Sequence, residues 1–204
     1  MKQLLFTLGM AGMVAASASA GTINYTTAGS TLSCNGIATC VQNNTTSVTV
    51  GGLTFTYSAG SGNNVNTPSI INLGNIASSG AGSNVNVTGL LLTLKVSAGA
   101  LTGNIQSAGV TGSVSTNSSG ATIAWTNNNT TTGFGTLPGV VLAPLVFQVL
   151  NPSLGLQAPT VGTPVGQTSI QGTVTDTSTP EPATMAMLGL GLGLIGLLGR
   201  RTAR

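Results

Sequence analysis

The fold is indicated most clearly by the stretch Ser47-Val-Thr-Val-Gly-Gly-Leu-Thr-Phe-Thr-Tyr57. It places a pair of glycines between two runs in which apolar and polar residues alternate. Two-residue hairpin loops need positive φ angles, which glycine adopts at little cost, so this pattern predicts two antiparallel strands joined by a tight turn. With a two-residue loop, the apolar residues face one another across the pair and share one face of both strands. The facing pairs are Val50 with Leu53 and Val48 with Phe55.

Other segments continue the β pattern on the C-terminal side, separated by turns rich in Gly, Asn and Ser. We expect strands within Asn84–Val87, Leu90–Val96, Ser107–Ser115, Ala121–Thr126, Val140–Leu150 and Gln167–Thr175. Pro144 interrupts the fifth of these and predicts an edge position or a break, because proline lacks a backbone N–H. Roughly seven to nine short strands predict an all-β fold, a single jelly-roll-like β-sandwich over residues 21–175. A β-solenoid is the alternative, but no repeat of fixed period is visible.

The first twenty residues have the organisation of a secretory signal peptide. Lys2 supplies the positive charge, Leu4–Ala16 is the apolar core, and Ala18-Ser19-Ala20 is a cleavage site of the A-x-A type. We therefore expect a helical leader, export of the protein, and a mature chain that begins at Gly21.

The C-terminal segment has three parts. Pro180-Glu181-Pro182 follows a polar linker, residues 176–179, and precedes the uncharged, mostly apolar run Ala183–Gly199. A helix over this run would be about 25 Å long, close to the ~30 Å of a bilayer core. The arginine cluster that follows favours a cytoplasmic C-terminus. The segment thus predicts a transmembrane helix over residues 183–199. The cluster consists of Arg200, Arg201 and Arg204.

These three parts, in this order, resemble the PEP-CTERM sorting signal of bacterial exported proteins. The resemblance implies that an exosortase-type membrane protease recognises Pro180, Glu181 and Pro182 while the arginines hold the orientation. It also implies an inner-membrane intermediate and delivery to the cell surface or the extracellular polysaccharide matrix. A plain membrane anchor with a proline-containing stalk is the alternative. The resemblance covers the C-terminal segment only and leaves the function of the rest open.

The segment between leader and tail, which we call the passenger, is almost uncharged. The whole chain has five Lys and Arg residues and two Asp and Glu residues. Only Lys95 and Asp176 lie between Gly21 and Thr179. A neutral domain offers no electrostatic attraction to nucleic acid, so we exclude nucleic acid as a partner.

The passenger also lacks the usual catalytic groups. The chain contains no histidine, which excludes Ser-His and Cys-His nucleophiles and imidazole metal ligands. The passenger also lacks the pair of carboxylates that a glycosidase needs. A Ser-Lys dyad would have to use Lys95, which lies in an alternating stretch that favours an exposed, solvated side chain. We therefore predict that the protein is not an enzyme and binds no cofactor or metal.

Cys34 and Cys40 enclose five residues near the expected mature N-terminus. In an exported chain a pair of cysteines predicts a disulfide. A redox pair would need a different spacing, and a zinc site would need further soft ligands. We predict a structural disulfide that closes a local turn.

Trp125 precedes a loop rich in Asn and Thr and is the residue best suited to stack on a sugar ring, although a core position is the alternative. Tyr25, Tyr57 and Phe134 are open to the same two interpretations. The sequence therefore favours a non-enzymatic protein of the surface or the exopolysaccharide matrix. The alternatives are a carbohydrate-binding or adhesive module and a self-assembling fibre subunit, because uncharged strands lack protection against edge pairing.

Overall fold

The computed structural model describes residues 21–125, 139–160, 165–177 and 189–192. Gly21–Thr177 forms one compact unit, and the two terminal segments belong to another. The described part of the passenger consists almost entirely of strands, so the prediction of an all-β fold is confirmed. The leader, and the predicted transmembrane segment except residues 189–192, lie outside the described residues. The more specific jelly-roll assignment stays a prediction.

A first curled sheet has the strand order β16-β13-β10-β9-β1-β6, and β2 pairs with one end of β9. Its neighbours are all antiparallel, as in hairpins and meanders. The strands are β1 (Thr22–Thr26), β2 (Thr31–Cys34), β6 (Ser61–Asn66), β9 (Leu90–Ala98), β10 (Leu101–Thr111), β13 (Thr122–Trp125) and β16 (Ser153–Gly155).

A second curled sheet has the order β14-β15-β17-β7-β5-β4-β3, and a small third sheet has the order β12-β11-β8. The strands of the second sheet are β3 (Cys40–Asn44), β4 (Ser47–Val50), β5 (Leu53–Ala59), β7 (Ser69–Gly80), β14 (Gly139–Leu142), β15 (Leu145–Val149) and β17 (Val165–Asp176). Those of the third are β8 (Val85–Asn86), β11 (Ser113–Ser115) and β12 (Ser118–Ser119).

The hairpin predicted around the glycine pair is confirmed. Strands β4 and β5 pair with Val50 opposite Leu53 and Val48 opposite Phe55. Gly51 and Gly52 have φ angles of 54° and 85°, as a type I′ turn requires. All four facing apolar side chains are buried. The turn chemistry and the alternation therefore fix the register of this hairpin together.

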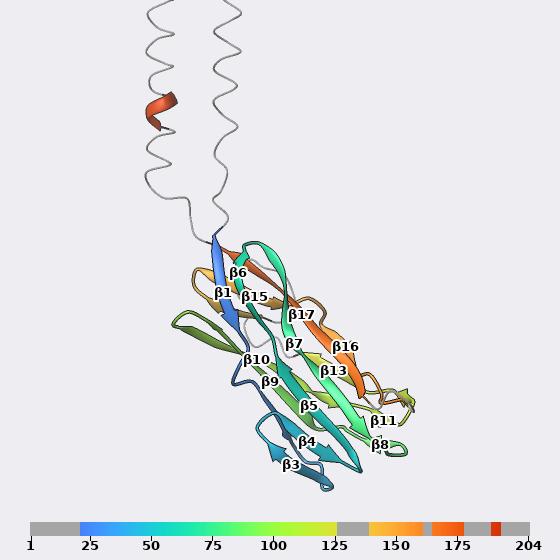
Figure 1. Cartoon of the computed structure of the whole chain (residues 1–204). Coiled ribbons are helices and arrows are strands. Elements are labelled where there is room, and N and C mark those ends of the chain that lie inside the picture. The colour runs from blue at the N-terminus through green and yellow to red at the C-terminus, as the bar shows by residue number, and fades with distance from the viewer. Residues whose placement is uncertain (1–20, 126–138, 161–164, 178–188, 193–204) are drawn as a thin grey trace, which may run out of the picture. The chain divides into compact units, whose positions relative to one another are not determined.

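Both large sheets contribute their inner faces to one hydrophobic core. On β17 exposed and buried residues alternate along almost the whole strand, and on β9 the buried residues follow the same period of two. The Tyr25 ring of β1 packs against the Phe147 ring of β15, which joins the first sheet to the second. Figure 1 shows that β3 and β4 lie at one end of the passenger, whereas β1 begins and β17 ends at the other.

Several strands differ from the sequence-based expectation. Val140–Leu150 contains two strands, β14 and β15, because the chain turns at Ala143-Pro144, so the predicted break is confirmed. The last strand includes Asp176, which the sequence assigned to the linker. Strand β7 was not predicted at all, although it lies at the centre of the second sheet. The sequence likewise missed β1, β2, β3, β6, β12 and β16. The predicted single strand Ser107–Ser115 is wrong, because its residues are divided between β10 and β11, which belong to different sheets.

Candidate functional site

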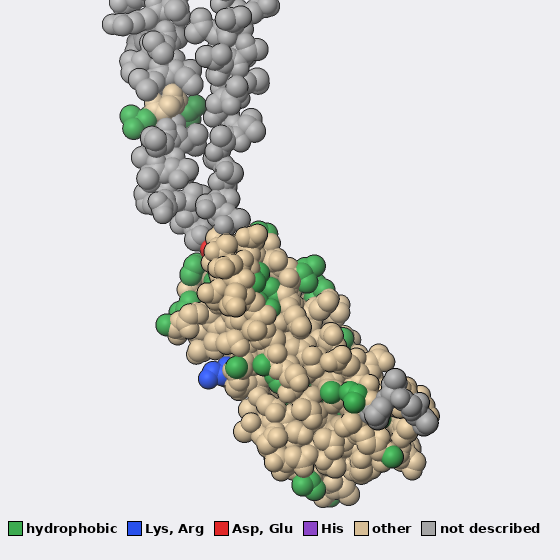
Figure 2. Space-filling view, in the orientation of Figure 1, with side chains coloured by type: hydrophobic (Ala, Val, Ile, Leu, Met, Phe, Trp, Pro, Cys, Tyr) green, Lys and Arg blue, Asp and Glu red, His purple; other side chains and the backbone are tan. Residues whose placement is uncertain are grey.

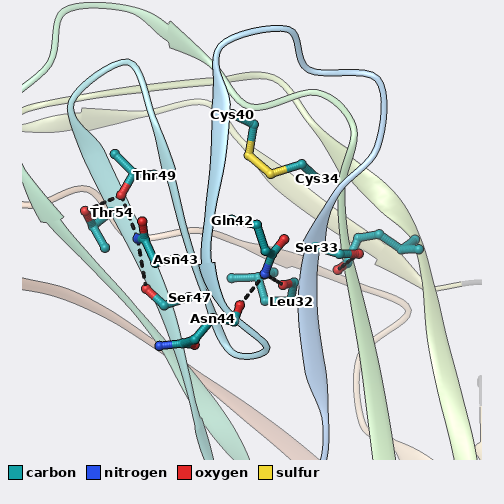
Figure 3. Close-up of a disulfide and its surroundings, with 11 residues drawn as sticks. Leu32, Ser33, Cys34, Cys40, Gln42, Asn43, Asn44, Ser47, Thr49 and Thr54 are labelled. Carbon is teal, nitrogen blue, oxygen red and sulfur yellow. Dashed lines mark hydrogen bonds between the residues drawn. A yellow bond between two sulfur atoms is a disulfide. The ribbon is translucent and has the colours of Figure 1, made fainter.

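The disulfide predicted from the cysteine pair is present. Cys34 ends β2 and Cys40 begins β3, and their Cα atoms are 6.1 Å apart (Figure 3). Because β2 belongs to the first sheet and β3 to the second, the bond links the two sheets at one end of the passenger. The side-chain amide of Gln42 adds a second link by donating to the Leu32 carbonyl at 2.7 Å. A loop this short stabilises the fold by about 2 kcal/mol in the chain-entropy model.

A network of hydroxyl and amide groups covers the outer surface of the second sheet beside this end (Figure 3). The Asn43 amide donates to the Thr49 hydroxyl at 2.8 Å, and Thr49 in turn hydrogen-bonds Thr54 at 2.9 Å. The hydroxyls of Ser47 and Thr56 form a parallel bond at 3.1 Å. These contacts run across three strands, so the side chains hold one another in fixed positions.

The same face continues over the central strands of the second sheet. Thr54 lies opposite Ser79 of β7, and Thr56 lies opposite Ala77. On β17, Gln167, Ser169 and Gln171 are exposed on this side. We call the whole surface the outer face. Its members are Asn43, Ser47, Thr49, Thr54, Thr56, Asn75, Ala77, Ser79, Gln167, Ser169 and Gln171, together with the exposed apolar residues Val41, Ile70 and Val165, and none of them is charged.

The space-filling view agrees with this composition. Side chains that are neither hydrophobic nor charged, together with the backbone, make up most of the visible surface, whereas hydrophobic side chains are scattered and charged ones are rare (Figure 2). An uncharged surface of hydroxyls and amides offers directional hydrogen bonds and no Coulomb attraction. It is therefore suited to a ligand that is itself neutral and rich in hydroxyls.

A shallow groove of about 580 Å³ lies at the disulfide end of the passenger. It is lined by the disulfide loop residues 36–39, by Gly51, and by Ser83, Val85, Asn86 and Thr88. Its polar groups are hydroxyls, one amide and the backbone. Like the outer face, the groove is lined by uncharged residues.

A buried hydrogen-bond cluster holds the turn between β1 and β2 against the second sheet. The Tyr57 hydroxyl donates to the Leu73 carbonyl at 2.6 Å and bonds the Thr27 hydroxyl at 2.7 Å. The Gly60 N–H donates to Thr27 Oγ1 at 2.8 Å. Ser30 Oγ donates to the Thr27 carbonyl and accepts the Lys95 N–H. All of these groups serve the fold, and no local sequence pattern predicts the cluster because its members are distant in the chain.

Burial raises the pKa of Tyr57 above its ordinary value of 10.0. The unfolded chain ionises first as pH rises, so the stability that the neutral phenol contributes is present below pH 10 and is lost as pH passes the folded pKa. We expect Tyr57→Phe to lower the free energy of unfolding by about 1–2 kcal/mol at pH 7 and to weaken the loss of stability above pH 10. Urea unfolding between pH 7 and 11.5 checks this. An alkaline slope equal to that of the wild type would contradict it.

Trp125 lies in the core. Only 7% of its surface is exposed, so the ring has almost no face on which a sugar could stack. Tyr25 and Tyr57 are buried too, at 6% and 3% exposure. Phe134 lies outside the described residues. The structure therefore brings no aromatic side chain of the described passenger to the surface as a stacking platform.

Lys95 is exposed on β9, as the alternation predicted, and its aliphatic stem lies near Gly29. The other charged side chain of the described passenger, Asp176, is on β17 in the other sheet. The described residues contain no cluster of three or more His, Cys, Asp or Glu side chains that could hold a metal ion.

The comparison with known families concerns the C-terminal segment. A neutral, β-rich passenger followed by this C-terminal segment is typical of an exported protein that carries its own sorting signal. Residues 178–204 match the PEP-CTERM protein-sorting motif. The match covers this segment alone. A sorting motif of this kind supports an exported protein that the membrane enzyme exosortase sorts to the cell surface or the extracellular space. No curated protein and no solved structure matches the chain.

Most of the predicted processing residues lie outside the described residues. This applies to Ala18 and Ala20, to Pro180, Glu181 and Pro182, and to Arg200, Arg201 and Arg204. Residues 189–192 are helical, with Leu190 and Leu192 exposed. Across the described ranges, no helix has both the length and the apolar character needed to cross a membrane.

Proposed function

We propose that the mature passenger is a non-enzymatic β-sandwich protein of the bacterial surface or extracellular polysaccharide matrix. The observation that carries this proposal is the outer face, where neutral hydroxyl and amide groups extend over β3, β4, β5, β7 and β17. Such a surface matches hydrated polysaccharide, which also presents dense uncharged hydroxyls. The lack of a charged cluster in the described passenger supports a role without chemistry.

The prearranged network favours binding over simple solvation. Side chains that already hydrogen-bond one another lose little rotamer entropy when a ligand replaces their water. Each contact is weak, yet a long polymer can engage many strands of one sheet at once, and linked contacts add through effective concentration. We therefore expect retention in a matrix to depend on the whole outer face, and no single residue to dominate it.

The test is retention of the protein in the producing bacterium. We expect Gln167→Glu with Gln171→Glu to reduce the matrix-bound fraction about five- to tenfold, because the new carboxylates would have to lose water against the polymer. Asn104→Asp, on the exposed side of β10 in the first sheet, is the matched control and should leave retention unchanged.

Replacing Pro180, Glu181 and Pro182 with alanine should keep the chain unprocessed in the membrane fraction.

Two results would contradict two different parts of the proposal, the role of the outer face and the location of the protein. Equal retention of the outer-face variant and the wild type would refute the role of this face. Processed protein found only in the periplasm would refute the surface or matrix location.

A carbohydrate-binding or adhesive module is the second candidate, favoured by the neutral groove at the disulfide end. This candidate predicts saturable binding of a short oligosaccharide, and replacing Ala38 or Thr39 with a larger residue should abolish that binding.

A self-assembling fibre subunit is the third candidate. Edge strand β3 contains no charged residue, and its Val41 is 59% exposed. An uncharged edge can pair with another strand. Processed protein that remains monomeric at high concentration in sedimentation analysis would remove this candidate.

A further inference from the structure

We propose that removal of the signal peptide creates an ion pair between the new α-ammonium group of Gly21 and the carboxylate of Asp176. The pair would connect the first residue of the mature chain to the end of its last strand. It is independent of the ligand or location proposed above. It depends on cleavage between Ala20 and Gly21, which the A-x-A site predicts.

The geometry places the two groups together. A Cβ atom built on Gly21 would lie 3.2 Å from Oδ2 of Asp176. Backbone bonds at Cα are about 1.5 Å long, so the Gly21 nitrogen is at most about 6 Å from the same oxygen. An opposite charge within about 4–6 Å already favours the charged form of an ionisable group, so the observed proximity is sufficient for the pair. Figure 1 shows the start of β1 and the end of β17 at the same end of the passenger.

Backbone hydrogen bonds hold both residues in place. The Gly21 carbonyl accepts the Thr67 N–H at 2.9 Å and the Thr67 hydroxyl at 3.1 Å. Beside Asp176, the N–H and the hydroxyl of Thr177 donate to the Pro144 carbonyl at 2.8 and 2.7 Å. The two ends are thus anchored to different neighbours before any charge is created, so the pair forms without ordering a free chain end.

Cleavage supplies the missing charge. In the precursor, the nitrogen of Gly21 is an uncharged amide. Hydrolysis of the Ala20–Gly21 bond consumes one water, leaves a carboxylate on Ala20 and an amine on Gly21, and the amine takes up a proton at neutral pH. In β1, β6, β7, β15 and β17, the ionisable side chains are Tyr25 and Asp176. The Tyr25 hydroxyl is a buried donor to the Asn72 carbonyl, so Asp176 is the charged group that faces the new ammonium.

A carboxylate at this range favours the charged form of the amine and raises its pKa above the ordinary range of about 7.7–8.0. The stability that the pair adds is then present below about pH 8, the pKa of the unfolded amine. It is lost as pH rises through the folded pKa. Solvent screens an exposed pair, so the expected effect is a small shift.

The experiment titrates the amines of the processed protein purified from the envelope. Competitive acetylation followed by mass spectrometry gives the pKa of the Gly21 amine, with the Lys95 amine in the same chain as an internal reference. We expect the pKa of the Gly21 amine to be about 0.5–1 unit higher in the wild type than in Asp176→Asn. Added salt at 0.5 M should reduce this difference through screening. Lys95→Gln is the control that removes a charge elsewhere and should leave the Gly21 titration unchanged.

Two results would overturn the proposal. The first is the same pKa for the Gly21 amine in the wild type and in Asp176→Asn, with both proteins folded by circular dichroism. The second is an intact mass that places the mature N-terminus at a residue other than Gly21. An unfolding midpoint that falls between pH 7 and 10 more steeply in the wild type than in Asp176→Asn would support the pair independently.

Discussion

Replacing Phe147 with alanine is expected to lower the free energy of unfolding of the passenger by about 3–5 kcal/mol. Phe147 is fully buried on β15, and its ring centroid is 6.2 Å from that of Tyr25 on β1. The substitution therefore removes apolar burial and leaves a cavity between the two sheets. Because whole domains are stable by only about 5–15 kcal/mol, this single change would remove a large share of the total.

Chemical denaturation of the processed protein, followed by circular dichroism, measures this effect. Val41→Ala on edge strand β3 is the control, since Val41 is 59% exposed and should cost less than about 0.5 kcal/mol. A loss below about 1 kcal/mol for Phe147→Ala would mean that the two sheets do not pack through this residue.

Gly74→Ala is expected to lower the free energy of unfolding by about 2–4 kcal/mol. Gly74 lies in β7 beside an irregularity of register, where Ile170 pairs with Gly74 but Gln171 pairs with Asn72. Its φ of 117° is unfavourable for any residue with a side chain. An added Cβ would also lie 2.5 Å from the Ser58 carbonyl and 2.6 Å from the Tyr57 hydroxyl. Strain and a steric clash thus act together.

Gly99→Ala separates these two contributions. Gly99 has a φ of 60° in the turn between β9 and β10, and an added Cβ there meets no atom within 4 Å. Its substitution should cost about 1 kcal/mol, the penalty of the left-handed region alone. Equal losses for Gly74→Ala and Gly99→Ala would show that the contacts of Gly74 in β7 tolerate a side chain.

The irregularity at Gly74 also explains why β7 could not be predicted. Before it, the inward positions are Ile71 and Leu73, and after it they are Ile76 and Ser78. The extra residue shifts the alternation by one position, so no single period of two runs through Ser69–Gly80. The neighbouring strands β5 and β17 supply the register that the local sequence does not define.

The position of aromatic residues was equally hard to predict. Because Trp125 precedes an Asn- and Thr-rich loop, the sequence allowed either a stacking role on the surface or a position in the core. Only 7% of its surface is exposed, which places it in the core. Tyr57 was ambiguous for the same reason. Its hydroxyl is satisfied by Thr27 and by the Leu73 carbonyl, partners separated from it by 30 and 16 positions in the chain. A long-range contact of this kind leaves no periodic trace in the sequence.

The sequence alone was sufficient to predict a feature wherever the residues that cause that feature are close together in the chain. The glycine pair at Gly51-Gly52 specifies its turn, Cys34 and Cys40 are close enough in the chain to join, and the sorting motif at residues 178–204 is contiguous. The outer face, the Thr27–Tyr57 cluster and the proximity of Gly21 to Asp176 arose only when distant strands paired. Those features depend on which strands become neighbours, and that is decided by burial of the shared core and by backbone pairing over the whole passenger.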